Sequence, residues 1–134
     1  MIIDFNTVTA FLNRKHVKLR PPASRANFSR IQEIINGSID NNIYEMYSIF
    51  DGFEELDFEP ASFIRIWSLD EVVKNNDLSS SPRLFFSDTD LMAIWYSVDF
   101  SDSSRQIFND NEVALASDLS SFWKMIISER FFPA

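Results

Sequence analysis

Apolar residues recur along the first part of the chain with the spacing of an amphipathic helix. Phe5, Val8, Phe11 and Leu12 lie three or four positions apart, which predicts a helix over residues 4–14. A basic stretch and two consecutive prolines follow, and proline cannot continue a helix. The pattern therefore indicates a separate first helix that packs through one apolar face.

Two further helices are predicted before residue 53. Ser24 is a suitable cap for the second, which ends at Asn36-Gly37, and Asp40 is a suitable cap for the third, which Asp51-Gly52 closes. Their apolar faces are formed by Phe28, Ile31, Ile34 and Ile35 in one helix and by Ile43, Met46, Tyr47 and Phe50 in the other. Glycine at both ends is typical of helix C-termini.

After Gly52 the pattern changes to short runs of aromatic and β-branched residues, which favour strands. Residues 53–60 are acid-rich and predict a loop. Four strands are predicted, at residues 63–67, 83–87, 92–98 and 106–108. A turn at 88–90 would join the second and third into a hairpin, and a short helical turn is expected at 69–74. Residues 75–82 and 99–105 are polar and predict loops.

The strongest helix pattern closes the chain. Ser117 is the expected cap and Asp118 lies in the first turn, ahead of Leu119, Phe122, Trp123, Ile126 and Ile127 at helical spacing. Helices, then strands, then a helix is the order of an α+β domain. We expect an antiparallel sheet of about four strands, with the N-terminal helices and the long C-terminal helix packed on it. No linker interrupts the sequence, so residues 1–134 are interpreted as a single domain.

Charge changes this picture because it is unevenly distributed. The net charge is −8, yet residues 1–30 hold six bases and one acid, a balance of +5, which leaves −13 for the remainder. An acidic body repels nucleic acid and anionic membranes and attracts basic partners. The basic segment is expected to solvate the junction between helices or to pair with the acidic body. We therefore predict a protein partner and no nucleic-acid or membrane binding.

Several kinds of chemistry lack the residues they require. The chain has no cysteine, which excludes disulfides, thiol nucleophiles and cysteine-ligated metals. The single histidine, His16, lies among bases, which repel metal cations. The start does not resemble a signal peptide and no run is long enough to span a bilayer, so a cytoplasmic location is expected.

Carboxylates remain as candidate catalytic groups, since two of them suffice for glycoside hydrolysis. Those at 88–90, 99–102 and 110–112 lie in predicted turns, where short acids commonly make local hydrogen bonds, although calcium ligation stays open. Aromatic residues in the predicted strands are interpreted as core rather than as stacking platforms for nucleic acid. We expect no enzyme activity and no cofactor, and a small carboxylate hydrolase is kept as an alternative.

Five segments of the sequence, taken in order, are Ile43-Tyr-Glu-Met-Tyr-Ser-Ile-Phe-Asp-Gly52, Phe63-Ile-Arg-Ile-Trp-Ser-Leu-Asp-Glu-Val72, Leu84-Phe-Phe-Ser-Asp-Thr-Asp90 with Ala93-Ile-Trp-Tyr-Ser-Val-Asp99, Gln106-Ile-Phe108 and Leu115-Ala-Ser-Asp-Leu-Ser-Ser-Phe-Trp123. Together they resemble the SUKH superfamily, the Smi/Knr-like proteins. The resemblance implies an α+β fold without catalytic residues. Many bacterial members are immunity proteins that neutralise a toxin, and others resemble intracellular regulatory adaptors.

The resemblance and the acidic balance together lead to one hypothesis, an immunity protein that plugs a basic, nuclease-type toxin domain. Acids would occupy the positions of substrate phosphates. The expected contact residues are Asp51, Glu54, Glu55, Asp57, Glu59, Asp88 and Asp90. The protein is expected to be a monomer or weak dimer, and a regulatory adaptor acting through protein–protein contacts is the alternative function.

Overall fold

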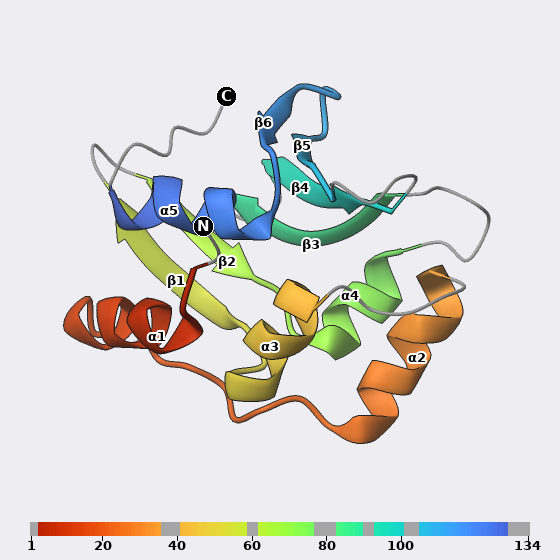
Figure 1. The fold of residues 1–134 in the computed structure, drawn as a ribbon, viewed down its shortest axis with the longest axis horizontal. Helices are drawn as coiled ribbons and strands as arrows, with labels where there is room; N and C mark the ends of the chain where they lie inside the picture. The colour runs from red at the N-terminus through yellow and green to blue at the C-terminus, as the bar shows by residue number, and fades with distance from the viewer. Residues whose placement is uncertain are drawn as a thin grey trace.

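Three helices precede the sheet, as the sequence predicts. The computed structural model describes residues 3–35, 41–58, 62–76, 83–89, 93–100 and 105–128. Its helices are α1 (Phe5–Arg14), α2 (Arg25–Ile35), α3 (Asn41–Ile49), α4 (Leu69–Asn75) and α5 (Leu119–Ile127) (Figure 1). The segment predicted as a short helical turn is the helix α4. The α+β class predicted from the order of elements is confirmed.

Helix α1 begins and ends for local reasons. The Asp4 side chain accepts a hydrogen bond from the backbone N–H of Asn6 at 2.9 Å, which caps the first turn. Past the other end, His16 adopts a left-handed φ of 60°, and the N–H of Val17 donates to the carbonyl oxygen of Leu12 at 3.0 Å. All four residues of the predicted stripe are buried, so the helix packs through the face that the sequence indicates.

Helix α5 uses a different cap from the predicted one. The side chain of Asp118 accepts from the N–H of Ser121 at 2.8 Å, whereas the hydroxyl of Ser117 lies 3.0 Å from that of Ser121. Asp118 is therefore the N-cap, and a carboxylate suits this position because it also faces the positive end of the helix dipole. The predicted cap of α3, Asp40, lies outside the described residues.

Six antiparallel strands form one sheet in the described part of the chain, and neighbours in sequence are neighbours in space. They are β1 (Phe53–Phe58), β2 (Ser62–Ile66), β3 (Arg83–Thr89), β4 (Ile94–Asp99), β5 (Ile107–Asn109) and β6 (Ala114–Ala116). The four predicted strands correspond to β2 to β5. The expectation of about four strands is corrected by the two edge strands, β1 and β6.

Strand β1 lacks the alternating pattern that identifies a strand in a sequence. Its register with β2 shifts between Phe53 and Leu56, which are both buried, and the two residues between them, Glu54 and Glu55, are both exposed. This irregularity removes the strict alternation of inward and outward side chains. A polar strand with a bulge therefore resembles a loop. Strand β6 has only three residues and no pattern to detect.

One face of the sheet is covered by helices α1, α3 and α5, which pack on one another (Figure 1). Trp123 of α5 lies at the centre of this layer, with its ring centroid 6.4 Å from that of Phe50 and 6.2 Å from that of Phe53. Phe122 contacts the sheet through Phe86, at 5.7 Å. Helix α2 packs on α4, which in turn lies against β3. The hydrophobic core thus joins the first and last helices, α1 and α5, to the sheet.

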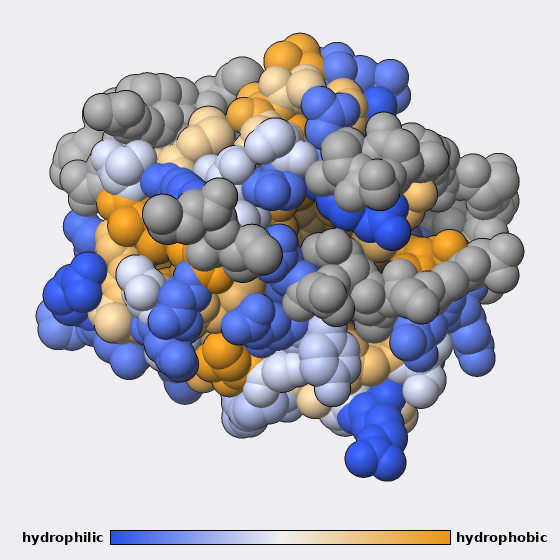
Figure 2. Space-filling view, viewed as in Figure 1, coloured by the Kyte–Doolittle hydropathy of each residue, from blue (hydrophilic) through white to orange (hydrophobic). Residues whose placement is uncertain are grey.

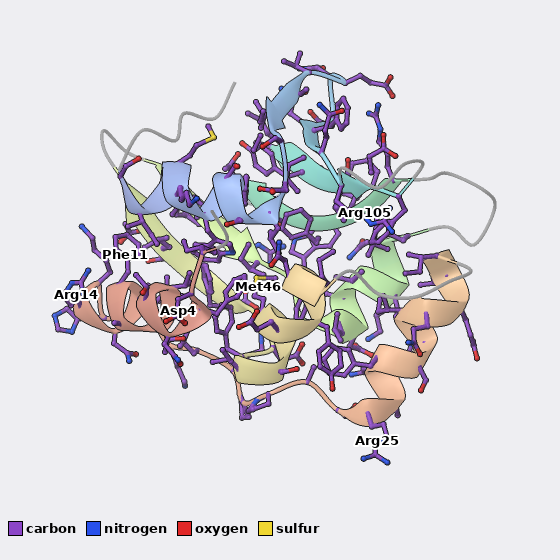
Figure 3. All side chains as sticks on the ribbon, viewed as in Figure 1. Asp4, Phe11, Arg14, Arg25, Met46 and Arg105 are labelled. Carbon is purple, nitrogen blue, oxygen red and sulfur yellow. The ribbon has the colours of Figure 1, made fainter. Side chains whose placement is uncertain are left out.

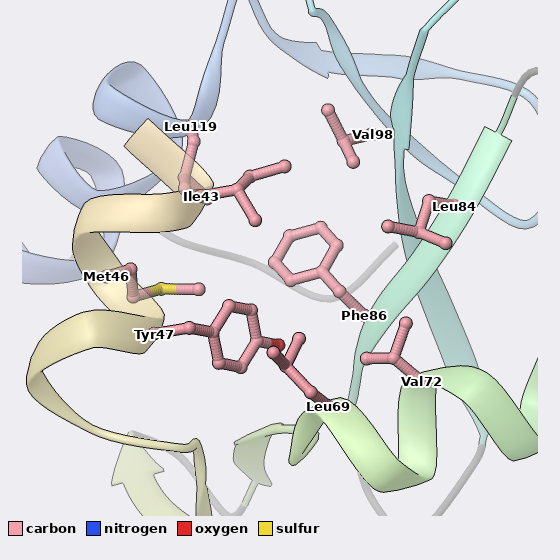
Figure 4. Close-up of a pocket in the computed structure, with 9 residues that line it drawn as sticks. All are labelled: Ile43, Met46, Tyr47, Leu69, Val72, Leu84, Phe86, Val98 and Leu119. Atoms are coloured by element: carbon pink, nitrogen blue, oxygen red, sulfur yellow. The ribbon is translucent and has the colours of Figure 1, made fainter. Parts of the chain in front are cut away.

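A small gap remains where α3, α4 and α5 meet β3 and β4 (Figure 4). Its volume is about 10 Å³, and its lining consists of Ile43, Met46, Tyr47, Leu69, Val72, Leu84, Phe86, Val98 and Leu119. This space is at most the size of one water molecule, and its surface offers an internal water few polar partners. It is an imperfection of core packing and not a ligand site.

Gly52 fixes the connection between α3 and β1. Its φ is +79°, and a Cβ atom there would lie 2.3 Å from the carbonyl oxygen of Ile66 and 2.7 Å from that of Trp67. Both the left-handed backbone and the close approach of β2 require a residue without a side chain. Gly52 therefore positions β1 directly beside β2, which places the acids of β1 next to Arg65 of β2.

Candidate functional site

The seven acids predicted to bind a partner occupy different environments. Two of them lie outside the described residues: Glu59 and Asp90. The other five lie on two strands and at the junction before β1: Asp51, Glu54, Glu55, Asp57 and Asp88. The segment predicted as an acidic loop is the strand β1, and the first two residues of the turn predicted at 88–90 belong to the strand β3, which extends to Thr89.

Arg65 of β2 is the centre of a buried charged cluster. It is 8% exposed, and the register of the sheet places it opposite Asp88 of β3. Arg65 Nη2 lies 2.6 Å from Asp88 Oδ2 and 3.2 Å from Glu71 Oε2, and Arg65 Nη1 lies 2.9 Å from Glu54 Oε2. One guanidinium thus joins carboxylates from β1, β3 and α4, a geometry that the planar fork of arginine suits.

Asp88 is not a surface acid, which corrects the prediction that placed it in an exposed turn. The residue is 0% exposed, and its Oδ2 also accepts a hydrogen bond from Trp67 Nε1 at 2.6 Å. The physical reason is the length of β3, since the strand continues through this position and turns the carboxylate toward Arg65. An acid enclosed in this way cannot contact a partner protein without the sheet opening.

The cluster holds Arg65 as a cation. Hydrogen bonding to Asp88 raises the pKa of Arg65 above its ordinary value, and this effect exceeds the opposing effect of burial. Breaking such a buried pair is far more costly than replacing it with apolar residues, because it leaves one charge without compensation. The arrangement therefore acts as a structural clamp across three strands and α4.

Glu54 connects this clamp to the basic N-terminal segment. Its carboxylate accepts hydrogen bonds from both Arg65 and Arg20, and Arg20 belongs to the segment between α1 and α2. A second ion pair joins Arg30 of α2 to Asp70 of α4 at 3.3 Å. Of the two roles expected for the basic segment, these contacts correspond to pairing with the acidic body. Hydrophilic side chains cover much of α1 and α2 (Figure 2).

Within the described residues, Asp51 forms hydrogen bonds with backbone groups rather than an ion pair with an arginine. Its Oδ1 accepts a hydrogen bond from the backbone N–H of Leu69 at 2.8 Å, at the first residue of α4. Its own N–H donates to the carbonyl oxygen of Pro21 at 3.0 Å. Asp51 thus ties the junction before β1 to both α4 and the N-terminal segment, and its carboxylate already has a backbone partner.

Glu55 and Asp57 are the predicted acids that remain available within the described part of the chain. Both are exposed on β1, which is an edge strand of the sheet, and neither has an ion-pair or hydrogen-bond partner for its side chain among the described residues. On the outer side of β1, an isolated bridge joins Phe53 to Leu19. We call Glu55 and Asp57 the acidic edge.

Sequence reasoning missed the residue that organises the site. The sequence pattern places Arg65 in an aromatic and β-branched strand and predicts no role for it. The sequence Phe63-Ile-Arg-Ile-Trp67 nevertheless indicates a role, because a base flanked by apolar residues in a strand is expected to be buried. A buried base requires a carboxylate as its partner. The sequence does not show which of the twenty acids is that partner.

The sequence matches no model of a protein family and no curated protein. Within the described ranges, no group of three or more His, Cys, Asp or Glu residues is placed to hold a metal ion. None of the helices described has both the length and the apolar composition of a membrane span. The residues of the site are therefore the basis for assigning a function.

Proposed function

We propose that this chain is an immunity protein of the SUKH type, which binds a basic toxin domain and covers its active or substrate-binding surface. The observation that carries the proposal is the acidic edge. Glu55 and Asp57 are exposed acids without partners in the described structure, on a strand that the fold holds in place. Free carboxylates on a fixed backbone suit the recognition of a cationic surface.

The structure supports a recognition role because the acidic edge is preorganised. Phe53 and Leu56 are 1% and 2% exposed and anchor β1 in the core on either side of Glu55. The clamp at Arg65 holds the neighbouring Glu54 as well. Acids on such a strand lose less conformational freedom on binding than acids on a loop, so more of the interaction energy remains as affinity.

The charge of the whole chain supports the choice of a basic partner. The balance of −13 over residues 31–134 produces a long-range field that steers a cationic domain toward this protein. Steering of this kind raises association rates to roughly 10⁸ M⁻¹s⁻¹ or more at low salt. Nuclease domains carry basic surfaces because they bind phosphates, and carboxylates placed there would exclude the substrate.

The resemblance to SUKH proteins supports the choice of a toxin as that partner. Its five segments fall on α3 and the junction at Gly52, on β2 and α4, on the β3–β4 hairpin, on β5, and on β6 with α5. The similar segments thus lie mostly on helices and strands between α3 and α5, and β1 is the strand of this region that they leave out.

The proposal is tested by co-expressing this protein with the toxin encoded beside its gene. The wild type is expected to protect the cells, and the double variant Glu55→Lys/Asp57→Lys to lose protection and to bind the purified toxin at least about tenfold more weakly. Glu33→Lys/Glu45→Lys is the matched control, since it makes the same change in charge at two exposed acids of α2 and α3. It is expected to retain protection.

Three results would count against the proposal. Cells that die equally fast with and without the wild-type protein would remove the toxin as partner. Equal loss of protection in both double variants would show that net charge matters and the acidic edge does not. A pull-down that recovers signalling proteins and no toxin would favour the regulatory adaptor.

A further inference from the structure

A second surface, opposite in charge to the acidic edge, lies between helices α2 and α3. A groove of about 370 Å³ opens there, within the size range of known ligand sites. Its lining includes the aromatic pair Phe28 and Tyr44, together with Arg25, Ser29 and Gln32. This groove takes no part in the clamp at Arg65 or in the acidic edge.

The aromatic pair gives the groove an apolar floor. The rings of Phe28 and Tyr44 lie 4.9 Å apart, and Tyr44 is 55% exposed. Tyr44 and Val113 are the large hydrophobic residues that stand out as exposed among those described. An exposed tyrosine supported by a second aromatic ring, beside an arginine, has the composition of a binding hot spot.

Two polar side chains of the groove, those of Arg25 and Gln32, have no partner among the described residues. Arg25 is exposed and has no ion-pair or hydrogen-bond partner among the described residues, in contrast to Arg20 and Arg30, which pair with Glu54 and Asp70. The side chain of Gln32 likewise has no hydrogen-bond partner in the described part of the chain. A cation and an amide donor thus face the groove with their donors available.

The charge of the lining selects the occupant. Arg25 is the one charged residue of the lining, and the acids of the two helices, Glu33 and Glu45, are not part of it. Two other bases of the N-terminal segment, Arg20 and Arg30, already pair with Glu54 and Asp70, so the guanidinium of Arg25 is the positive charge that the lining presents. A carboxylate is complementary to a single exposed guanidinium, whereas nucleic acid needs several cations along its backbone.

We propose that the groove between α2 and α3 binds a short acidic peptide segment of a partner protein. In this arrangement an aromatic or aliphatic side chain of the segment rests on Phe28 and Tyr44. A neighbouring carboxylate pairs with Arg25, and a backbone carbonyl oxygen of the segment accepts a hydrogen bond from the side-chain amide of Gln32. The inference does not rest on the toxin, because the two surfaces differ in position and in sign.

The test is a titration of the full-length, isotope-labelled protein followed by NMR. The probe is the peptide Asp-Glu-Trp-Glu-Asp, and the comparison probes are Lys-Lys-Trp-Lys-Lys and a short thymidine oligonucleotide. The acidic peptide is expected to shift the backbone resonances of α2 and α3 at concentrations of about 1 mM or below. Neither comparison probe is expected to do so.

Matched variants separate the groove from general electrostatics. Arg25→Glu is expected to weaken binding of the acidic peptide about tenfold, and Tyr44→Ala about fivefold. Arg14→Glu makes the same charge change on α1, far from Arg25 (Figure 3), and Val113→Ala truncates the other exposed hydrophobic residue. Both controls are expected to change the affinity less than about twofold.

The proposal is overturned if the acidic peptide leaves α2 and α3 unshifted, or if Arg14→Glu weakens binding as much as Arg25→Glu. Stronger shifts of the same helices with the oligonucleotide would assign the groove to nucleic acid instead. The side chains of Arg25 and Tyr44 are exposed, so the NMR spectra of Arg25→Glu and Tyr44→Ala are expected to match the wild-type spectrum outside the groove. Such a match excludes unfolding as the cause of weaker binding.

Discussion

Asp88 and the acidic edge show how differently the same chemical group is used in two parts of one sheet. Asp88 on β3 is fully buried and shares hydrogen bonds with Arg65 and Trp67. Glu55 and Asp57 on β1 are exposed and have no side-chain partner among the described residues. The difference comes from their neighbours, since a central strand offers a buried base and an edge strand offers solvent. Acidic composition therefore predicts a recognition surface only where the fold leaves the acids without partners.

Glu54 lies between these two extremes. Its side chain is 61% exposed, yet it binds both Arg20 and Arg65. Exposure by itself does not identify the acids available for recognition, because an exposed carboxylate that already holds two arginines must give up those contacts before it binds anything else. Of the seven acids predicted from the sequence, this reasoning retains Glu55 and Asp57 as candidates within the described residues.

The largest effect is expected from removing the buried acid. Asp88→Ala leaves Arg65 as a buried charge without its main partner and leaves Trp67 Nε1 without an acceptor. We expect a loss of about 3 kcal/mol or more in the free energy of unfolding, measured by urea denaturation. Glu55→Ala is the control and is expected to change that free energy by no more than about 0.5 kcal/mol.

A double variant tests whether the uncompensated charge is the cause. Arg65→Met combined with Asp88→Leu replaces the pair with apolar side chains and is expected to recover part of the loss, since apolar replacements of buried ion pairs are often tolerated. A cost below about 1 kcal/mol for Asp88→Ala would contradict the description of this pair as a buried clamp.

An intermediate effect is expected at Tyr47, which lies beside the clamp. Its hydroxyl donates to the carbonyl oxygen of Trp67 at 2.7 Å. Tyr47→Phe removes that donor and is expected to cost about 1 to 2 kcal/mol in the free energy of unfolding. An unchanged stability would mean that the carbonyl group finds another donor.

The same variant is expected to change the alkaline pH dependence of stability. Burial raises the pKa of Tyr47 well above its ordinary value of 10.0, and the charges of Asp51 and Glu71 raise it further. The unfolded chain loses this proton above about pH 10 while the folded chain keeps it, so stability falls as the pH rises past that point. Tyr47→Phe should show a smaller decline between about pH 9 and about pH 11.

The smallest effect on stability is expected at the acidic edge. The double variant Glu55→Gln/Asp57→Asn removes two charges that have no partners in the described structure, so its free energy of unfolding should stay within about 0.5 kcal/mol of the wild type. Its binding to the toxin should nevertheless weaken. A loss of stability comparable to that of Asp88→Ala would show that these acids serve the fold, and the contrast between the two regions would fail.

The sequence predicted the helices better than the strands. The stripe at Phe5, Val8, Phe11 and Leu12 is buried as expected, because a helix displays its whole apolar face at a fixed spacing. Strand β1 was missed because Glu54 and Glu55 both face away from the core at a bulge, and that irregularity depends on the pairing with β2. Edge strands in general carry polar residues that make them resemble loops.

The order of the helices and of the four strands β2 to β5, the α+β class and the acidic balance of the chain follow from the sequence alone, because each depends on local spacing or on a sum of charges. The tertiary structure decided which acidic side chains have no partner among the described residues. Arg65 and Asp88 are 23 positions apart and meet only through the register of two strands, which also directs Trp67 toward the same carboxylate. No local pattern specifies that pairing, because the register is selected by packing the whole face of each strand against the core.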